Sequence, residues 1–306
     1  MSAIYSVHEL PANAPVDSEQ LGTKRKFWCQ HPKMGLCLFK MGRPGHGENW
    51  AEKACAHLAQ LLYLPVAQIE LAVWHSETGA QIGTLSPYML PPSYQLVHGN
   101  EILEGIIADY PRDIARTSEH TVKRVLKCLG TYSPHARVAP MMRTAAHQFV
   151  GYLMFDAWVG NMDRHHENWA LVQPLHQQPS QWFLSPTYDH GSSLGRELND
   201  ERKEQILQQA HPDHNLAAYA SRGRGRFFRL VTDPKSQSLK PIDAFRLAAE
   251  MLPQAALNWR MLLRQVKLIK VEAVFKSFPS DWLTNTGSRF ARALLEHNRQ
   301  QILSVS

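Results

Sequence analysis

The chain has 306 residues and a mass of 34.8 kDa, with 44% apolar, 20% charged and 9% aromatic residues. These proportions are normal for a soluble globular protein and exclude fibrous, collagen-like and wholly disordered chains. The 33 basic and 27 acidic residues give a formal net charge of +6 with neutral histidines. This charge favours anionic partners without distinguishing nucleic acid, nucleotide and phospholipid.

Neither the cysteines nor the apolar stretches point to secretion or to a membrane. The four cysteines form no C-x-x-C pair, which is typical of buried thiols in a reducing compartment. The first thirty residues show no signal region. The most apolar stretch, Phe149–Val159, is about eleven residues long and is interrupted by Asp156, whereas about 20 residues are needed to cross a bilayer. We therefore expect a cytoplasmic protein without stable membrane insertion.

The first part of the chain predicts a strand-rich lobe with a lysine at a strand end. Residues 1–17 contain two prolines and predict a loose terminus. Apolar runs at 26–29 and 36–39 flank a turn with proline and glycine, so we expect a hairpin there. Lys40 follows directly on the second strand of this hairpin.

A helix and two further strands complete this lobe. Apolar residues recur at three- and four-residue steps over 48–62, which predicts an amphipathic helix that carries Glu52. Strands are predicted at 68–74 and 81–85, and the proline-rich stretch after them ends regular structure. We therefore predict a nucleotide-binding N-lobe over residues 18–92.

The remainder of the chain, 93–306, predicts a mostly helical lobe. Ser118 is a candidate N-cap for a helix that ends at Gly130. A helix over 144–159 is apolar on nearly every side, so we expect it at the centre of this lobe. The other predicted elements are two short strands at 169–172 and 181–184, and helices from about 199, at 241–264 and at 288–303.

Three polar residues after the central helix follow an order that suits phosphoryl transfer. Asp163 lies on the loop after that helix, Asn168 comes five residues later, and Asp189 precedes Gly191 after a predicted hairpin. Divalent cations that bridge nucleotide phosphates require hard oxygen ligands, and the acceptor hydroxyl needs a carboxylate nearby. Asp163 is therefore the candidate base, and Asn168 and Asp189 are candidate Mg²⁺ ligands.

The same chemistry needs a cation on the phosphates of ATP and a carboxylate that holds this cation in place. The N-lobe offers Lys40 and Glu52 for these roles, and Arg164 and His165 are then electrostatic and orienting groups of the catalytic loop. Taken without that loop, Lys40 and Glu52 would be an ordinary surface lysine and an ordinary helix charge. The ordered set favours the kinase interpretation.

We expect ATP to lie between the lobes of a two-lobed, protein-kinase-like α+β fold. This fold has a small antiparallel-sheet N-lobe with one helix and a larger, mostly helical C-lobe. The hinge is placed at residues 86–90, where Ser86, Tyr88 and Met89 would contact the nucleotide. Catalysis would consist of positioning and of charge neutralisation by two Mg²⁺ ions.

Two segments resemble HipA-like serine/threonine kinases of the bacterial type. Gly160–Asn168 is similar to the catalytic loop of these kinases, and Tyr188–Gly195 to their metal-binding segment. The D-R-H-x-x-N motif of the first segment also resembles the loop of phosphatidylinositol 3- and 4-kinases. Further similarity lies at Leu38–Lys40, Glu48–Lys53 and Val97–Glu101.

The resemblance implies an ATP- and Mg²⁺-dependent kinase that phosphorylates serine or threonine in a protein, with the residues above in the same roles. It also implies a phosphate-covering loop at Gly22, Thr23 and Lys24. Some members of the family carry an autophosphorylated serine next to this loop. Ser18 and Thr23 are therefore the autophosphorylation candidates of this chain.

The chain departs from the family pattern at two points. His190 replaces the Phe of the usual D-F-G, which changes a packing position and leaves the metal carboxylate in place. The extra N-terminal subdomain of longer HipA proteins is not expected here, which weakens the case for a toxin role. The expected partners are a protein substrate and an antitoxin-like protein, with nucleic acid only through the substrate.

Three other functional classes use the same residues. A metallohydrolase could use His165, His166 and His190 with the neighbouring carboxylates, although no H-E-x-x-H spacing is present. A pseudokinase would bind nucleotide and transfer nothing. A phosphatidylinositol-type lipid kinase is the alternative within kinases, although no amphipathic helix with a basic face stands out.

A glycine-spaced group of arginines is a candidate for binding anions. It consists of Arg222, Arg224, Arg226 and Arg229, and Phe227 and Phe228 lie between the last two of these arginines. Such a group could bind nucleic acid through phosphates and stacking, although a solvated loop is the commoner role. Within a kinase it could also lie near the acceptor site and attract an acidic substrate.

Overall fold

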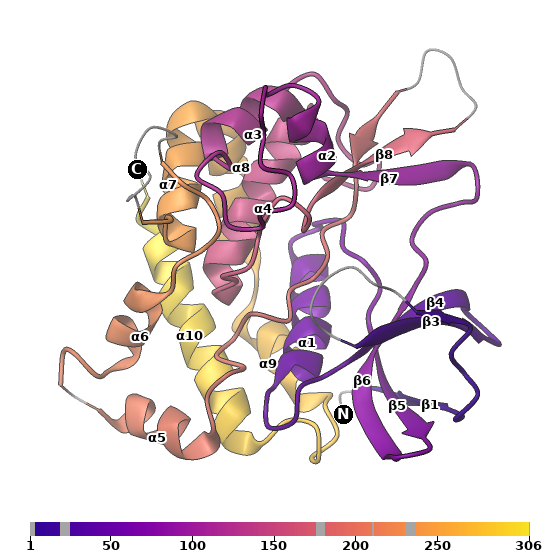
Figure 1. Ribbon diagram of the computed structural model, residues 1–306. Coiled ribbons are helices and arrows are strands. Elements are labelled where there is room, and N and C mark those ends of the chain that lie inside the picture. Colours follow the sequence, from indigo (N-terminus) through magenta and orange to yellow (C-terminus); the bar gives the residue numbers. More distant parts are fainter. Residues whose placement is uncertain (1–3, 19–24, 176–180, 210, 230–236, 306) are drawn as a thin grey trace.

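The computed structural model describes residues 4–18, 25–175, 181–209, 211–229 and 237–305. Figure 1 shows a sheet from the N-terminal residues on one side of the molecule and most of the helices on the other. The helix α1 (Glu48–Leu61) lies between these two parts. The chain is thus divided into a strand-rich part and a helix-rich part.

A mixed sheet forms the strand-rich part. Its strand order within the described residues is β1-β5-β6-β4-β3-β2. The strands are β1 (Val7–Leu10), β2 (Asp17–Ser18), β3 (Lys26–His31), β4 (Gly35–Met41), β5 (Glu70–Ser76) and β6 (Gly79–Pro87). The predicted hairpin is confirmed as β3 and β4, and the two later strands are confirmed as β5 and β6.

The register of this sheet decides where Lys40 points. β4 pairs with β6, so that Lys40 lies opposite Thr84 and Phe39 lies opposite Leu85. Successive side chains of a strand alternate between the two faces of the sheet. Phe39 and Leu85 join a small apolar cluster on one face, and Lys40 therefore projects from the other face.

Regular structure begins earlier than the sequence predicts. β1 pairs in parallel with β5, from Val7 opposite Leu71 to Leu10 opposite Trp74. Leu10 is buried, and the backbone N–H of Tyr5 donates to the carbonyl of Ser277 at 2.6 Å. The expectation of a loose terminus over residues 1–17 is therefore wrong for this stretch. A strand of four residues is too short to show a clear alternating pattern.

The helix predicted over 144–159 is confirmed as α4 (Ala145–Val159). The Thr144 hydroxyl caps its first turn by accepting a hydrogen bond from the backbone N–H of His147. Gly160 ends the helix in the left-handed conformation, at φ 70°, which costs glycine little. The segment that resembles a catalytic loop therefore starts directly at the end of a buried helix.

The other elements of the helix-rich part surround α4. They are β7 (Tyr94–His98), α2 (Gly99–Glu104), α3 (Val122–Leu129), β8 (Ala170–Pro174), β9 (Phe183–Leu184), α5 (Asp200–Gln208), α6 (Leu216–Arg222), α7 (Pro241–Met251), α8 (Pro253–Gln265), α9 (Leu268–Lys276) and α10 (Asn285–Leu303). β8 and β9 confirm the two predicted short strands, and β7 joins them as a third strand that the sequence does not predict.

Two helix boundaries differ from the predicted ones. α3 is capped by Thr121, whose hydroxyl accepts from the backbone N–H of Arg124, and not by Ser118. The helical stretch predicted at 241–264 is two helices, because Leu252 is non-helical and Pro253 begins the second one. A proline inside a continuous helix would lose a hydrogen bond and clash with the preceding turn.

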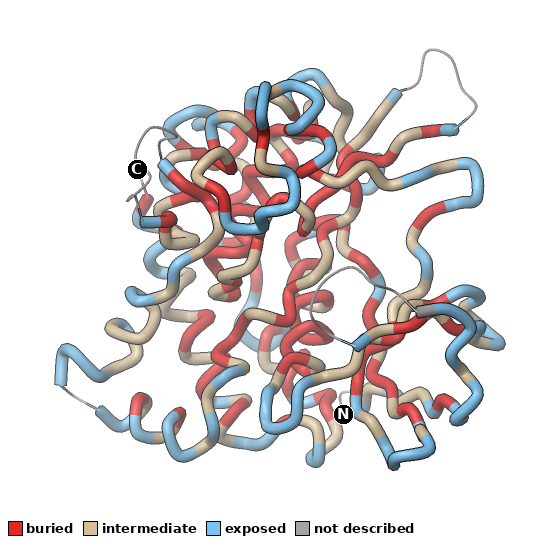
Figure 2. Tube along the Cα trace, viewed as in Figure 1, coloured by how far each residue is buried: buried red, intermediate tan, exposed pale blue. Residues whose placement is uncertain are grey.

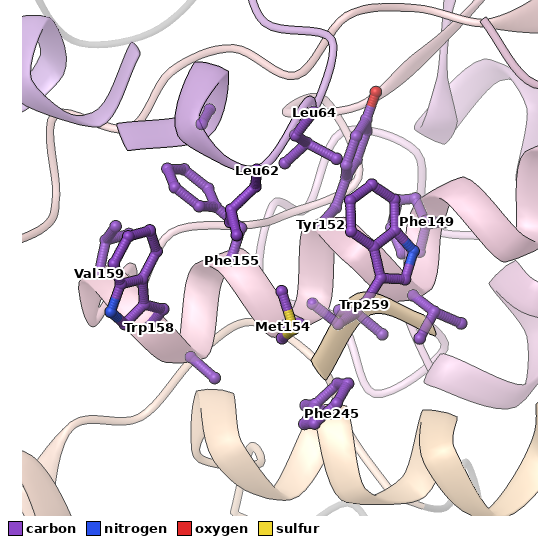
Figure 3. Packing of buried hydrophobic residues seen from close by; sticks show 14 of the residues in the cluster. Leu62, Leu64, Phe149, Tyr152, Met154, Phe155, Trp158, Val159, Phe245 and Trp259 are labelled. Atoms are coloured by element: carbon purple, nitrogen blue, oxygen red, sulfur yellow. The ribbon is translucent and has the colours of Figure 1, made fainter. Parts of the chain in front are cut away.

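The apolar interior consists mainly of one large cluster around α4. Figure 2 shows the buried residues concentrated along α4 and α1. In Figure 3, Leu62 and Leu64 lie beside the aromatic side chains of α4, among them Tyr152 and Phe155. The buried apolar side chains of α1 belong to this cluster, whereas the far face of the sheet has a small cluster of its own. Among the described residues, no helix has the length and apolar character needed to span a membrane.

Candidate active site

Lys40, near the end of β4, meets a carboxylate from the distant D-x-G segment. Its Nζ lies 3.7 Å from Oδ1 of Asp189, and 18% of its side chain is exposed. Burial opposes the charged ammonium, but the carboxylates of Asp189 and Glu52 outweigh burial and raise the pKa of Lys40 above its ordinary value. Lys40 is therefore a cation at neutral pH, at the contact between the two parts of the molecule.

Glu52 approaches the same place from α1. Its side chain is buried, and Oε1 accepts a hydrogen bond from the backbone N–H of His190 at 3.3 Å. The D-x-G segment is thus attached to α1 through a backbone donor. Since Glu52 also raises the pKa of Lys40, the structure brings Lys40, Glu52 and Asp189 together.

The backbone at Asp189 has an uncommon conformation. Its φ is 58°, in the left-handed region that favours glycine and is tolerated by aspartate and asparagine. Such conformations cost of the order of 1–3 kcal/mol and persist only where the surrounding structure fixes them. The Asp189 side chain remains 37% exposed beside Lys40, so its carboxylate can reach a ligand.

The loop after α4 is held by hydrogen bonds of its own residues. Asn161 donates from Nδ2 to Oδ1 of Asp156, the last polar residue of α4, at 2.8 Å. The backbone N–H of Asp163 donates to Oδ1 of Asn161 at 3.1 Å. Asn168 donates from Nδ2 to the carbonyl of Asp163 at 2.7 Å. Asp163 and Asn168 therefore lie at the two ends of one short, closed loop.

Arg164, predicted as an electrostatic and orienting group, lies inside this loop. Its guanidinium forms two 2.8 Å hydrogen bonds with the carboxylate of Asp156, and both side chains are almost fully buried. A further N–H donates to the carbonyl of Asn168 at 2.7 Å and, at 3.4 Å, to that of Tyr188. One guanidinium thus joins α4, the Asn168 end of the loop and the residue before Asp189.

His190 occupies the position where the family pattern has Phe. Its ring is buried and stands edge to face against Phe155, with the ring centres 5.2 Å apart. Its Nε2 lies 3.1 Å from Nη2 of Arg164 and 2.9 Å from the Thr187 hydroxyl. Burial and the Arg164 charge hold the pKa of His190 well below its usual value, so the ring is neutral and Nε2 accepts from Arg164.

His165, His166 and Glu167 form a compact group in the middle of the loop. One ligand atom from each lies within 4.8 Å of the others. Burial lowers the pKa of His165, although Asp163, Glu167 and Asp189 act in the opposite direction. His166 is fully buried and shares a 2.8 Å hydrogen bond with the Tyr110 hydroxyl.

The oxygen donors of the site suit a divalent cation. Asn168 turns Nδ2 toward the loop backbone, so that its Oδ1 faces the other way. Asp189 presents a carboxylate, and the Arg164 guanidinium holds the carbonyls of residues 168 and 188 close to each other. Carboxylate and amide oxygens are the ligands that Mg²⁺ takes in proteins. Asn168 and Asp189 are the residues that would hold such an ion.

The similarity noted at Val97–Glu101 has a structural explanation. The backbone N–H groups of Gly99 and Asn100 donate to the carbonyls of Trp169 and His166, at 2.9 and 3.1 Å. A Cβ on Gly99 would lie only 2.2 Å from the Trp169 ring. α2 therefore contacts the loop after α4 through a position that has room only for glycine.

Of the other predicted site residues, those that the structure describes lie in or near the sheet. Gly22 and Thr23 fall outside the described residues, and Ser18 ends β2, which pairs with β3. Ser86 belongs to β6 and donates from Oγ to the carbonyl of Gln68 at 2.8 Å. Tyr88 and Met89 follow β6, in the stretch that connects this sheet to β7.

Two side chains of the site have contacts that the sequence does not predict. Asp156 binds Arg164 and Asn161, and its signal is the single charge in an otherwise apolar helix. Arg226 donates from Nε to Oδ1 of Asp163 at 2.9 Å. The sequence marks Arg226 only as one member of an arginine group, because 63 residues separate it from Asp163.

No protein-family model and no curated protein matches the sequence. Among solved structures, the chain is similar to the Helicobacter pylori proinflammatory kinase CtkA, with a TM-score of 0.68 and 16% identity over 92% of each chain. It is also similar to the Shewanella oneidensis HipA structure with HipB and operator DNA, with a TM-score of 0.52 and 14% identity over 94% of this chain and 64% of that chain.

At these identities the comparisons establish the fold. The match to the CtkA structure extends over nearly the whole of both chains. The predicted two-lobed, protein-kinase-like fold is therefore confirmed. The chain has the fold of the HipA-like atypical kinases.

Proposed function

We propose that the chain is an ATP-dependent kinase that transfers the γ-phosphoryl group to a serine or threonine hydroxyl of a protein. The observation that carries this proposal is the contact of Lys40 with Asp189, with Glu52 bound to the next residue of the same segment. Arg164 links this segment to the loop that bears Asp163 and Asn168. The meeting of residues from these distant stretches supports phosphoryl transfer, which needs a cation, a carboxylate base and metal ligands around the phosphates.

Each side chain has a role that follows from its place. Lys40, charged and held between two carboxylates, would bind the phosphates of ATP. Asn168 and Asp189 would hold Mg²⁺, which neutralises charge on the phosphates when it is bound. Asp163 is one-third exposed and would accept the proton of the acceptor hydroxyl. His190 packs against Phe155 and Arg164, so the exchange of Phe for His leaves the carboxylate of Asp189 in place.

The test is transfer of radiolabel from [γ-³²P]ATP with Mg²⁺ to dephosphorylated casein and to the protein itself. We expect Asp163→Ala and Asp189→Ala each to lower the rate by roughly 10²- to 10⁴-fold while the melting temperature stays close to that of the parent. Asp243→Ala, which removes a partly exposed carboxylate on α7, is the control and should transfer like the parent. Unchanged transfer by Asp163→Ala would contradict the assignment.

The acceptor class can be separated with the same label. A bacterial lysate and phosphoinositide vesicles are offered in parallel, and we expect label in protein. Label found in lipid alone would favour the lipid-kinase alternative. Mapping the sites on the protein itself tests Ser18 and Thr23, which we propose as autophosphorylation sites.

A specific observation favours one second candidate. His165, His166 and Glu167 place three ligand atoms within 4.8 Å of one another, as a transition-metal centre would require. A hydrolase built on this group would carry stoichiometric zinc or iron. Elemental analysis of the purified protein separates the two proposals, since the kinase proposal expects neither metal to be retained.

The partner remains part of the proposal. The Shewanella HipA structure contains HipB and operator DNA, and we propose that an antitoxin-like protein is one partner of this chain as well. Co-purification of such a protein with this chain, from cells that produce both, would show this partnership. Direct binding to DNA is not expected, and a steep salt-dependent retention on DNA would contradict this expectation.

A further inference from the structure

The only described hydrogen bond of the Arg226 side chain goes to the candidate base. Nε of Arg226 donates to Oδ1 of Asp163 at 2.9 Å. The two side chains are 36% and 33% exposed, so solvent and substrate can reach both. Within the described residues, the terminal nitrogens of this guanidinium donate to no protein group.

The catalytic loop itself supplies no cation to Asp163. Arg164 is the only arginine or lysine between residues 163 and 168, and its guanidinium is committed to Asp156 and to the loop carbonyls. With 3% of its side chain exposed, Arg164 cannot turn toward a substrate without breaking a buried ion pair. The positive charge beside Asp163 therefore comes from outside the loop.

The backbone on both sides of Arg226 is anchored. Its carbonyl lies 3.2 Å from Nδ1 of His120, which therefore donates to it. Phe227 is buried and stacks on the His120 ring at 4.1 Å. Gly225 and Phe227 each share a backbone hydrogen bond with Leu239, at 2.8 and 2.6 Å. The backbone that carries Arg226 is therefore held in place where this side chain reaches Asp163.

We propose that Arg226 is a positioning residue for Asp163, which is an inference that depends on the proposed kinase function. Its Nε holds Oδ1, so that Oδ2 of Asp163 is the oxygen that faces the acceptor hydroxyl. The guanidinium also offsets the repulsion between the Asp163 carboxylate and the incoming γ-phosphoryl oxygens. Arg226, from the segment after α6, thus positions the base and offsets its charge, which no residue of the loop can do.

The chemical step conserves atoms and charge. The acceptor oxygen forms a bond to the γ-phosphorus, and the bond from this phosphorus to the β–γ bridging oxygen breaks. The electron pair of the broken bond leaves with ADP. The acceptor proton passes to Oδ2 of Asp163, while Arg226 stays bound to Oδ1 and itself transfers no proton.

The test is the steady-state rate of Arg226→Ala with [γ-³²P]ATP, Mg²⁺ and dephosphorylated casein. A misplaced base costs turnover and not nucleotide binding. We expect kcat to fall by roughly 10²-fold and KM for ATP to change by less than about three-fold. Methylguanidine added at millimolar concentration should restore part of the activity to Arg226→Ala but not to Asp163→Asn. A purely structural role would not give this rescue.

Arg246→Ala is the matched control. Arg246 binds Asp243 at 2.9 Å on the surface of α7, with exposure similar to that of Arg226, but it lies outside the catalytic loop. Both alanine variants should melt close to the parent, since an exposed ion pair contributes only about 0–1 kcal/mol. If Arg226→Ala alone has a lower melting temperature, kcat is measured for Arg226→Gln instead, because glutamine keeps the packing of the side chain.

Three outcomes overturn the inference in different ways. Equal kcat in the parent and Arg226→Ala would overturn it alone, with the kinase function intact. Higher kcat in Arg226→Ala would show that Arg226 blocks Asp163 and does not position it. Absence of transfer from ATP by the parent would overturn the proposed function and this inference together.

Discussion

At the scale of single residues, the site depends on a charge buried in an apolar helix. Asp156 lies on α4, where every neighbouring position is apolar, and its carboxylate binds both Arg164 and Asn161. A buried carboxylate is costly unless it is paired and hydrogen-bonded. Asp156 meets this condition, and the result is that the end of the helix fixes the start of the catalytic loop.

Replacing Asp156 by Ala should therefore be far more damaging than replacing an exposed aspartate. The change leaves the Arg164 guanidinium buried without its partner, which typically costs about 3–5 kcal/mol of unfolding free energy. The expected result is a lower midpoint of urea unfolding. Asp243→Ala removes a carboxylate of an exposed pair and should cost less than about 1 kcal/mol. Equal losses of unfolding free energy in the two variants would show that the Asp156 pair contributes no more to stability than the Asp243 pair.

The residues of the site differ in how far the sequence reveals them. Asp163, Asn168 and Asp189 are identified from spacing because they lie on two short segments with a fixed local pattern. Arg226 reaches the site only through its packing on His120, and no local pattern encodes a contact across 63 residues. The role of Asp156 could have been predicted, since a lone charge in an apolar helix needs a partner.

At the scale of elements, α2 is placed by its contact with the catalytic loop. It begins at Gly99, whose N–H donates to Trp169, and His98 just before it lies 3.0 Å from the Tyr188 hydroxyl. Tyr188 in turn donates to the carbonyl of Glu167 at 2.8 Å. This short helix, whose Ile102 and Leu103 are buried in the large cluster, is thus also held by hydrogen bonds to the loop after α4.

Two glycines at the two ends of α2 allow this placement to be tested. A Cβ on Gly99 would lie 2.2 Å from Trp169 and 2.4 Å from the carbonyl of His166, so Gly99→Ala must displace the catalytic loop. A Cβ on Gly105 would meet nothing closer than 3.5 Å. We expect Gly99→Ala to lose about 1–3 kcal/mol of stability and most of its transfer activity, whereas Gly105→Ala keeps both. Thermal melting and the casein assay measure the two effects.

The predicted elements agree with the structure where a strong hydrophobic period or a turn signal marks them. The hairpin before Lys40 and the helices α1 and α4 have clear patterns, and the structure has them at the predicted places. β1 and β7 were not predicted, because each is a short strand whose partner lies far along the chain. Tertiary pairing and not local propensity determines such strands.

At the scale of the whole molecule, neutral buried histidines make stability depend on pH. Burial lowers the pKa of His120 to about 3, and burial together with the Lys53 charge lowers that of His57 to about 4. Below pH 6.5 the unfolded chain binds protons at these rings that the folded chain does not bind. The stability that these rings contribute is therefore complete above pH 6.5 and is lost as the pH falls toward 4.

Urea unfolding at pH 7.5 and at pH 5 measures this dependence. One fully buried ring contributes about 1.4 kcal/mol per pH unit, so His120 alone should cost on the order of 2 kcal/mol between pH 6.5 and 5. His57→Gln should show a shallower decline than the parent, because one of the titrating rings is gone. A midpoint that stays constant from pH 7.5 to 5 would contradict the prediction.

The attachment of α1 to the large cluster has a consequence for opening and closing. α1 packs both in the large cluster that contains α4 and on β5 and β6 of the sheet. Lys40 lies on β4 of that sheet, whereas Glu52 lies on α1 and binds the residue after Asp189. A compound that separated β4 from α1 would therefore part the lysine from both carboxylates in one movement.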